Sequence, residues 1–320
     1  MTVSAEPPVF DEGAARREIA GRRLSAPQSW RSAGHLAVAW GLYAACAVVA
    51  VQVDNWAVRV VVWFAMAWLL LGNGAVVHET LHRHLFGAPW MNRVVGVIAG
   101  TSVGLPFSMY RCYHLGHHQY SCTADDPEGA PYLFRSRAYY LLIPVGGPLF
   151  ALQFVWWTLA TLAGRPPTFV RSRRQVPGVV VDGLVSIAFY AAMVLVGVWS
   201  FEVLACVWLV PWLVTVIVLE PFVLIPEHYG ASAERAALAL ATTRTVQSNP
   251  LVTWVYWGNN LHTAHHLAGG VVPQRIGEVT QEFVLPNVTA EWSAPGYVAF
   301  HWRLLRSLPW WPAKVPSDAA

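Results

Sequence analysis

The amino-acid sequence predicts an all-α membrane protein with four transmembrane helices in two hairpins, further interfacial or re-entrant helices, and a cytoplasmic cap. Three features of the composition lead to this class. Of the 320 residues, 55% are hydrophobic and only 12% are charged, whereas a soluble domain carries about 25% charged residues. The 17 tryptophans are typical of a chain that meets the boundary between membrane and water. The net charge of +3 is too small to indicate a nucleic-acid partner.

The first element is a polar N-terminal segment, residues 1–33, which we expect to be a cytoplasmic tail. It contains no apolar run of the kind found in a cleaved signal peptide. It carries an arginine cluster made of Arg16, Arg17, Arg22, Arg23 and Arg31. We expect a membrane domain over residues 34–275 and a cytoplasmic C-terminal segment over residues 276–320.

Two pairs of apolar stretches follow the tail. Residues 34–53 and 56–77 are separated only by Asp54 and Asn55, and residues 179–199 and 203–226 flank a turn at 200–202. At 1.5 Å per residue, each stretch is long enough to cross about 30 Å of hydrocarbon. Each pair therefore predicts a transmembrane helical hairpin.

Two further stretches, residues 89–109 and 139–163, are apolar but interrupted by glycine and proline. If only the two hairpins cross, every lysine and arginine except Arg59 lies on one side of the membrane. Positive residues collect on the cytoplasmic side. We therefore expect the two interrupted stretches to be interfacial or re-entrant, with the N-terminus and the C-terminus in the cytoplasm and the protein in the cytoplasmic membrane.

Histidine is the chemically informative residue in this chain. Ten of the twelve histidines fall into four clusters, at positions 78–84, 114–118, 228 and 262–266. Because a helix turns by about 100° per residue, histidines three or four positions apart share one face. Nine can converge in this way: His78, His82, His114, His117, His118, His228, His262, His265 and His266. His84 points away from His78 if the first helix continues past it.

Nine imidazoles are about twice the number that one metal ion takes from a protein. The sequence therefore indicates two metal ions of a kind that imidazole binds, such as zinc, copper, iron or nickel, and the absence of accompanying thiolates disfavours an iron–sulfur cluster and Cu(I). Two irons with four or five imidazoles each could keep positions open for dioxygen. Residues 78–82 also match the H-E-x-x-H pattern of zinc proteases, with Glu79 as general base. An intramembrane zinc protease is thus an alternative, although it leaves the other histidines unexplained.

Several polar residues near the histidines are candidates for orienting the rings. Glu79 directly follows His78, Glu227 directly precedes His228, Asp125 and Asp126 follow the second cluster, and Asn259 and Asn260 precede the last. Glu220 lies inside an apolar span, where a carboxyl group is a functional candidate by default. We assign it to a substrate channel.

The clusters resemble the three histidine boxes of the membrane fatty acid desaturase and hydroxylase superfamily. His78 and His82 match the first box, His114, His117 and His118 the second, and His262, His265 and His266 the third. His228 matches a further histidine that members carry before the third box. Residues 227–230 resemble a motif of alkane monooxygenases, and Asp125-Asp126-Pro127 resembles lipid desaturases and carotenoid ketolases. The second box has two intervening residues, whereas alkane monooxygenases typically have three.

The resemblance implies a di-iron site that uses O2 as co-substrate to oxidise an aliphatic lipid chain, most simply by desaturation. Hydroxylation or ketolation of a lipid, alkane or carotenoid by the same site is the alternative, because the boxes do not separate these reactions. No redox domain is visible in the sequence. The resemblance therefore implies a separate electron donor, either ferredoxin or cytochrome b5 with its reductase.

Overall fold

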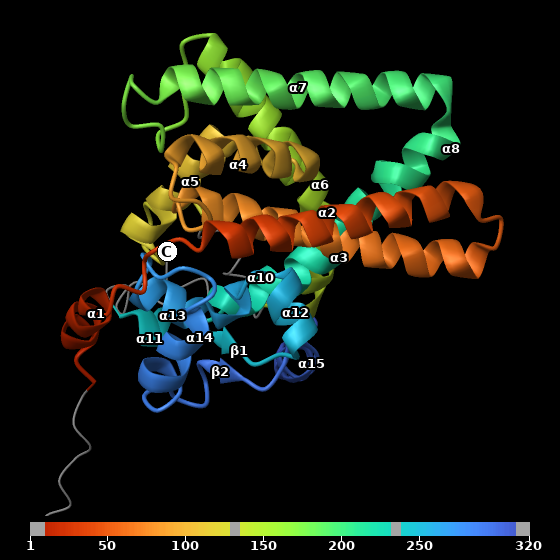
Figure 1. Ribbon diagram of the computed structural model, residues 1–320. Coiled ribbons are helices and arrows are strands. Elements are labelled where there is room, and N and C mark those ends of the chain that lie inside the picture. Colours follow the sequence, from red (N-terminus) through yellow and green to blue (C-terminus); the bar gives the residue numbers. More distant parts are fainter. Residues whose placement is uncertain (1–9, 129–134, 232–237, 312–320) are drawn as a thin grey trace, which may run out of the picture.

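Long apolar helices and a smaller polar cap make up this computed structural model, which describes residues 10–128, 135–231 and 238–311. The first hairpin consists of α2 (Ser29–Gln52) and α3 (Trp56–Leu81). Its turn is set by Asn55, whose side chain accepts a hydrogen bond from the Val58 N–H and so caps α3. In Figure 1, α2 and α3 lie side by side and run nearly parallel to α7 (Val176–Trp199).

The second hairpin pairs α7 with an interrupted helix over Phe201–His228. This helix contains α8 (Phe201–Leu204), α9 (Val210–Val214) and α10 (Glu220–His228), joined by π-helical turns at Ala205–Leu209 and Thr215–Leu219. Arg59 and Glu202 form an ion pair of 2.7 Å between the two hairpin ends that lie away from the cap. The two predicted hairpins are therefore present.

Shorter helices place further histidines beside α3. Helix α4 (Pro89–Val103) packs along α3, and α5 (Phe107–Tyr120) follows it after a short turn at Gly104. At 15 residues, α4 is too short to span a membrane. This agrees with the expectation of an interfacial or re-entrant segment there.

Helix α6 (Arg137–Leu162) differs from its expected form. It runs through Pro144 and Pro148 as one continuous helix of 26 residues. Within the described residues, five helices are therefore long and apolar enough to cross a membrane, one more than the four we expected. In Figure 1, however, α6 passes behind α2 and α3 at a steep angle instead of running alongside them.

Both ends of α6 are attached to parts of the molecule that lie beside the cap. At its start, the Arg137 N–H donates to the Pro309 carbonyl at 2.8 Å, just after α15 (Tyr297–Ser307). After its end, the ring of Phe169 lies 5.4 Å from that of Tyr113 in α5. The two ends of α6 therefore lie on the same side of the helical bundle.

The cap is built mainly from the chain after α10. Its helices are α11 (Ala239–Thr242), α12 (Pro250–Val255), α13 (His262–Leu267) and α14 (Ile276–Val279), with a 3-10 turn at Asn259–Leu261 and a π turn at Thr280–Val284. Two short parallel strands, β1 (Thr245–Val246) and β2 (Ser293–Ala294), pair Thr245 with Ser293 and Val246 with Ala294.

The N-terminal segment is part of this cap. Helix α1 (Glu12–Gly21) buries Ala15 and Ile19 against a cluster that includes Leu267 and Val279. The Glu12 carboxylate accepts hydrogen bonds from the N–H groups of Ala239 and Leu240 at 3.0 and 2.9 Å. The chain therefore returns after α10 to the side from which it started.

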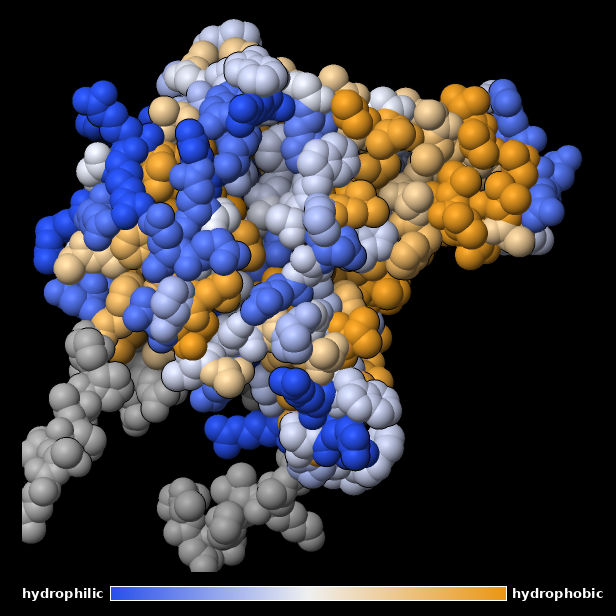
Figure 2. All heavy atoms as spheres, turned by 60° about the horizontal axis from the view of Figure 1, so that its bottom comes forward, coloured by the Kyte–Doolittle hydropathy of each residue, from blue (hydrophilic) through white to orange (hydrophobic). Residues whose placement is uncertain are grey.

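The surface matches this arrangement. In Figure 2 a broad apolar region separates the hydrophilic cap, on the left, from a small hydrophilic tip on the side of the hairpin turns. Exposed residues of the long apolar helices include Val198, Leu195 and Leu149 at 81%, 69% and 61%. An apolar band of this kind is suited to contact the hydrocarbon of a bilayer, which shields exposed apolar side chains from water.

Candidate metal centre

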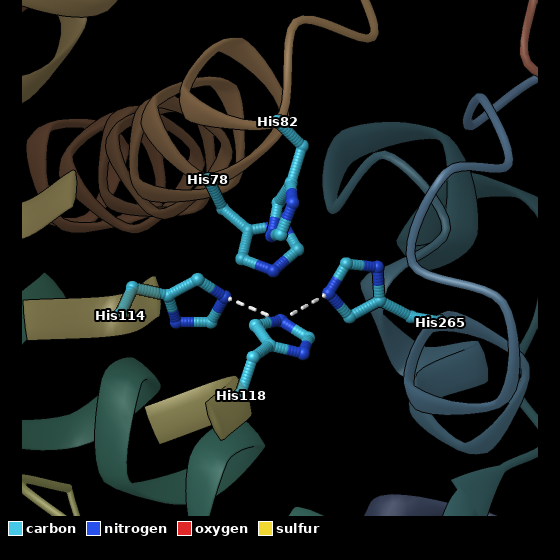
Figure 3. A group of neighbouring side chains, drawn as sticks. All are labelled: His78, His82, His114, His118 and His265. Carbon is cyan, nitrogen blue, oxygen red and sulfur yellow. Dashed lines mark hydrogen bonds between the residues drawn. The ribbon is translucent and has the colours of Figure 1, made fainter. Parts of the chain in front are cut away.

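The nine predicted histidines gather where the helices meet the cap, in two adjacent groups. The first group contains His78 and His82 at the end of α3, His114 and His118 on α5, and His265 on α13. The second contains His117 of α5, His228 at the end of α10, and His262 and His266 of α13. Within each group the potential ligand nitrogens lie within 4.8 Å of one another. Figure 3 shows the five rings of the first group pointing to a common centre from three elements.

Helical spacing explains how one short helix serves both groups. On α5, His114 and His118 are four residues apart and face the first group, while His117 turns toward the second. Helix α13 divides its histidines in the same way, with His265 in the first group and the other two in the second. The boxes therefore do not each form one site, because two of them contribute to both.

Oxygen acceptors fix the outer nitrogen of several rings. The Nδ1 atom of His117 lies 3.0 Å from both carboxylate oxygens of Asp126, and that of His114 lies 3.1 Å from Glu128 Oε1. The Nδ1 of His228 lies 3.0 Å from the Thr242 carbonyl. Because these oxygens accept, each Nδ1 carries the proton, and each neutral ring presents the lone pair of Nε2 inward.

The inward nitrogens come too close together to be satisfied by one another. Nε2 of His117 and Nε2 of His228 are 3.1 Å apart. In the first group, the single Nε2 of His118 lies 2.9 Å from the Nε2 atoms of both His114 and His265. Facing lone pairs repel, and a cation between them would remove this repulsion. A distance near 3 Å is also what two neighbouring imidazole ligands reach at about 2.1 Å from one metal ion.

Other ring nitrogens are buried with no hydrogen-bond partner among the described residues, and unpaired buried nitrogens are costly in free energy. They are Nε2 of His78, His82 and His266, and Nδ1 of His262. A metal ion in each group would satisfy the three Nε2 atoms, so the residues present fit two metal ions. Nδ1 of His262 is an outer nitrogen and faces Glu227.

Burial also keeps the rings in the form that binds metal. It lowers the pKa of His114 and His265 well below the usual range, and nearby imidazoles lower it further. His117 is the exception, because the negative charges of Glu128 and Asp126 outweigh burial and raise its pKa. Burial raises the pKa of Glu128 itself to about 7. Neutral imidazoles are metal ligands, whereas imidazolium is not.

The residues predicted to orient the rings do not all do so. Glu79 and Asp126 contact histidines directly, and Glu227 lies 3.7 Å from His262 Nδ1 while accepting from the Tyr256 hydroxyl. Asn259 donates toward Glu79 at 3.4 Å.

Two of the predicted residues lie elsewhere. The Asn260 amide donates instead to the Val246 carbonyl in β1. Asp125 is exposed, and its carboxylate forms no hydrogen bond within the described part of the chain.

His84 lies differently from its expected position. Helix α3 ends at Leu81, and Arg83 takes a left-handed conformation with φ of 64°, so the chain turns back. The His84 ring is buried and stacks 5.2 Å from that of His82. Its Nδ1 lies 2.8 Å from Glu79 Oε2, while Nδ1 of His78 lies 2.8 Å from Oε1. Both oxygens of Glu79 are thus occupied, unlike those of a protease base that faces water.

Sequence reasoning missed Glu128 and Thr242. Glu128 lies two residues after Asp126, so its proximity to the second box was the available signal. Thr242 contacts His228 through its backbone carbonyl, and because every residue has such a carbonyl, the residue type gave no signal.

Glu220 lines two adjacent cavities. The larger, of about 600 Å³, lies between α5, α6 and α10 and includes Glu128, Gly146 and Gln153 in its wall. The smaller, of about 70 Å³, includes His78 and Asn259. The two share Glu220 and four other residues: Leu105, Tyr110, Val216 and Leu224. The two cavities therefore lie next to each other, between the α6–α10 face and the first histidine group.

Helices with apolar outer faces, together with two buried groups of histidines, define a membrane protein equipped to bind metal at its cap. Comparison with known proteins identifies the class more closely. The family model for fatty acid desaturase matches residues 54–294. The chain belongs to the fatty acid desaturase family and is an oxidoreductase, as its sequence resemblance indicated.

Characterised relatives agree. An sn-1 oleoyl-lipid 12-desaturase of Picosynechococcus sp. is 24% identical over 278 residues, covering 79% of this chain and 76% of the relative. A protein of the same name from Synechocystis sp. is 27% identical over 240 residues, covering 67% and 64%. The chloroplastic omega-3 fatty acid desaturase of Sesamum indicum is 32% identical over 107 residues, covering 32% and 23%.

Proposed function

We propose that this protein desaturates an alkyl chain of a membrane lipid, using two iron ions held by the nine histidines. The observation that carries this proposal is the pair of histidine groups beside two adjacent, mostly apolar cavities. In the proposed reaction a –CH2–CH2– unit loses two hydrogen atoms and becomes –CH=CH–. Dioxygen takes up these hydrogens with two protons and two electrons from a donor and is reduced to two molecules of water.

The histidine groups fit iron because their ligand atoms are neutral imidazole nitrogens in a carboxylate-lined shell. When bound, the iron ions would supply the oxidising power from O2 that an aliphatic C–H bond requires and that no side chain has. Glu79, Asp126 and Glu128 hold the outer nitrogens of their histidines and so fix the direction of the inward lone pairs.

The chain's apolar residues would position the substrate. We propose that the alkyl chain enters between α6 and α10, fills the larger cavity and passes Tyr110 and Glu220 to reach His78. Leu105, Val216 and Leu224 would surround it and exclude water from the reacting carbons. Two of the relatives named above are sn-1 oleoyl-lipid 12-desaturases and the third is an omega-3 fatty acid desaturase, which supports an acyl chain as the substrate.

We further propose that four helices cross the cytoplasmic membrane and that both termini and the histidines face the cytoplasm. The packing of α1 on the cap supports this, because a chain that returns to its starting side crosses an even number of times. Among the five candidates, α6 has both ends beside the cap. It would therefore be the helix that does not cross.

A separate ferredoxin or cytochrome b5 would supply the electrons. Arg171, Arg173 and Arg174 are exposed on the α6–α7 loop. Arg171 is already engaged, since it donates to Gln119 and to the Tyr120 hydroxyl. We propose that Arg173 and Arg174 attract an acidic donor. Reversing both to Glu should slow donor-driven turnover at low salt, and unchanged turnover would assign them to the membrane surface alone.

Lipid mass spectrometry of cells with and without the protein, together with metal analysis of the purified chain, tests the function. We expect about two irons per chain and loss of two hydrogen atoms from an acyl chain. Gain of one oxygen atom would instead establish hydroxylation or ketolation. A single zinc ion with cleavage of a membrane peptide would establish the protease.

A further inference from the structure

A separate pocket, of about 330 Å³, lies outside the histidine groups, where the end of α3 meets the starts of α4 and α5. Arg83, Arg93 and Arg111 all line it, together with Trp90 and Ser108. None of these five residues lines the path described above for the alkyl chain. The proposed reaction therefore leaves this pocket without a role.

The pocket has an excess of positive charge. Arg93 Nη2 pairs with Asp182 Oδ1 at 2.8 Å, and the other Asp182 oxygen accepts from the hydroxyl and the N–H of Ser108. Arg111 Nε donates only to the Leu81 carbonyl, at 3.3 Å. The Arg83 side chain forms no hydrogen bond or ion pair within the described ranges. Three guanidinium groups are thus balanced by one carboxylate.

The guanidinium groups of Arg83 and Arg111 are close enough to repel each other. Burial, followed by the charge of Arg83, lowers the pKa of Arg111. An anion in the pocket would remove this repulsion. Guanidinium also presents planar pairs of N–H donors that match phosphate oxygens.

The surroundings of the pocket identify the source of such an anion. Trp90, Val94 and Ile98 are 67%, 48% and 53% exposed and lie four residues apart along α4. They form one apolar stripe that begins at the pocket and continues about 12 Å along the helix. A ligand with a charged head and an apolar tail fits this surface, whereas free phosphate would leave the stripe unused.

We propose that this pocket binds the phosphate of an anionic membrane phospholipid through Arg83, Arg93 and Arg111, with an acyl chain on the stripe of Trp90, Val94 and Ile98. The lipid is a bound component of the protein and not its substrate. It would hold the α3–α4 junction, and with it the end of the first histidine box, at the membrane surface.

Arg83 provides a variant that should not disturb the fold. Its φ of 64° lies in the region that favours glycine or asparagine. Arg83→Asn therefore keeps the turn and removes the charge, and Arg83→Lys keeps the charge. Full-length protein in detergent would be titrated with phosphatidylglycerol or phosphatidylcholine of identical acyl chains, and bound lipid counted by native mass spectrometry.

We expect the wild type to bind phosphatidylglycerol more tightly than phosphatidylcholine. Arg83→Asn should weaken phosphatidylglycerol binding about fivefold, because this is the factor that one arginine contributes to binding at an anionic membrane surface. Arg83→Lys should retain most of the binding. Arg173→Asn, which removes an exposed arginine from a different loop, is the matched control and should bind as the wild type does.

Three results would overturn the proposal. Equal binding of phosphatidylglycerol and phosphatidylcholine would show that binding does not depend on an anionic headgroup. Equal losses in Arg83→Asn and Arg173→Asn, or no loss in either, would show that the pocket is not the site. Displacement of phosphatidylglycerol by millimolar inorganic phosphate, with the phosphate itself retained, would identify a soluble ligand in place of a lipid.

Discussion

At the scale of single residues, Asp125 and Asp126 are adjacent and identical in type, but their carboxylates have different hydrogen-bond partners and different exposure. Asp126 accepts from His117 Nδ1 and from the N–H groups of Cys122 and Glu128, at 2.8 to 3.0 Å. Asp125 faces solvent. One carboxylate therefore fixes a proposed metal ligand and the loop around it, while the other contacts neither.

Asp126→Asn should lower metal affinity about tenfold, because it removes the charge behind His117 while keeping one acceptor oxygen. Asp125→Asn should leave the affinity unchanged. Competition with a chelator, followed by metal analysis of both variants and the wild type, measures the difference. Equal affinity in all three proteins would mean that His117 needs no anionic partner.

His84 is the residue whose placement the helical projection predicted wrongly. The projection assumed a helix continuing to residue 84, but α3 ends at Leu81 and the left-handed Arg83 returns the chain toward the site. His84 then reaches Glu79, which also holds His78. A helical projection fails wherever the helix itself has ended.

At the scale of elements, adjacent glycines on α6 have opposite surroundings. A Cβ atom at Gly147 would lie 1.9 Å from the Val216 carbonyl oxygen, whereas one at Gly146 would meet no atom within 4 Å. Both line the larger cavity. Gly147 thus permits the close approach of α6 to the π turn before α10, and Gly146 leaves room beside it.

Gly146→Leu should reduce turnover of the lipid substrate by roughly tenfold or more, because its side chain would occupy the proposed path and displace the alkyl chain. Gly146→Ala should have little effect. Gly147→Ala should instead destabilise the fold by roughly 1–3 kcal/mol through overpacking. Desaturation assays and thermal unfolding of the three variants separate these effects. Full activity in stably folded Gly146→Leu would place the substrate elsewhere.

At the scale of the whole molecule, α6 decides the topology. Length and composition alone would make it a fifth span. With five crossings, His117 would lie on the opposite side of the membrane from His228, His262 and His266, although the ligand nitrogens of this group lie within 4.8 Å of one another. Only an even number of crossings allows the observed packing.

A cysteine introduced at Asp54 should react with a membrane-impermeant maleimide in intact cells, because the first hairpin turn would face outward in the proposed topology. A cysteine at Arg165 should react only after permeabilisation, because in that topology α6 would return to the cytoplasmic side. The unmodified chain, with its four free cysteines, gives the background. Labelling of Arg165→Cys in intact cells would show that α6 crosses.

Much of the architecture was predictable because it depends on local patterns. Apolar length predicted the two hairpins, and spacing of three or four residues brought the nine histidines together. The family, too, was evident from these clusters. The division of the chain at residues 33 and 275 stays a prediction, and α1, within the predicted tail, packs on the cap.

The sequence by itself therefore determined the helices, the histidine clusters and the family, because each follows from the period of a helix and the hydrophobic thickness of a membrane. The tertiary structure decided how the nine rings divide into groups of five and four, which carboxylate holds which ring, and on which side α6 ends. These features arise from contacts between residues distant in the sequence. Their distances and directions depend on how the helices pack, and no local pattern records that packing.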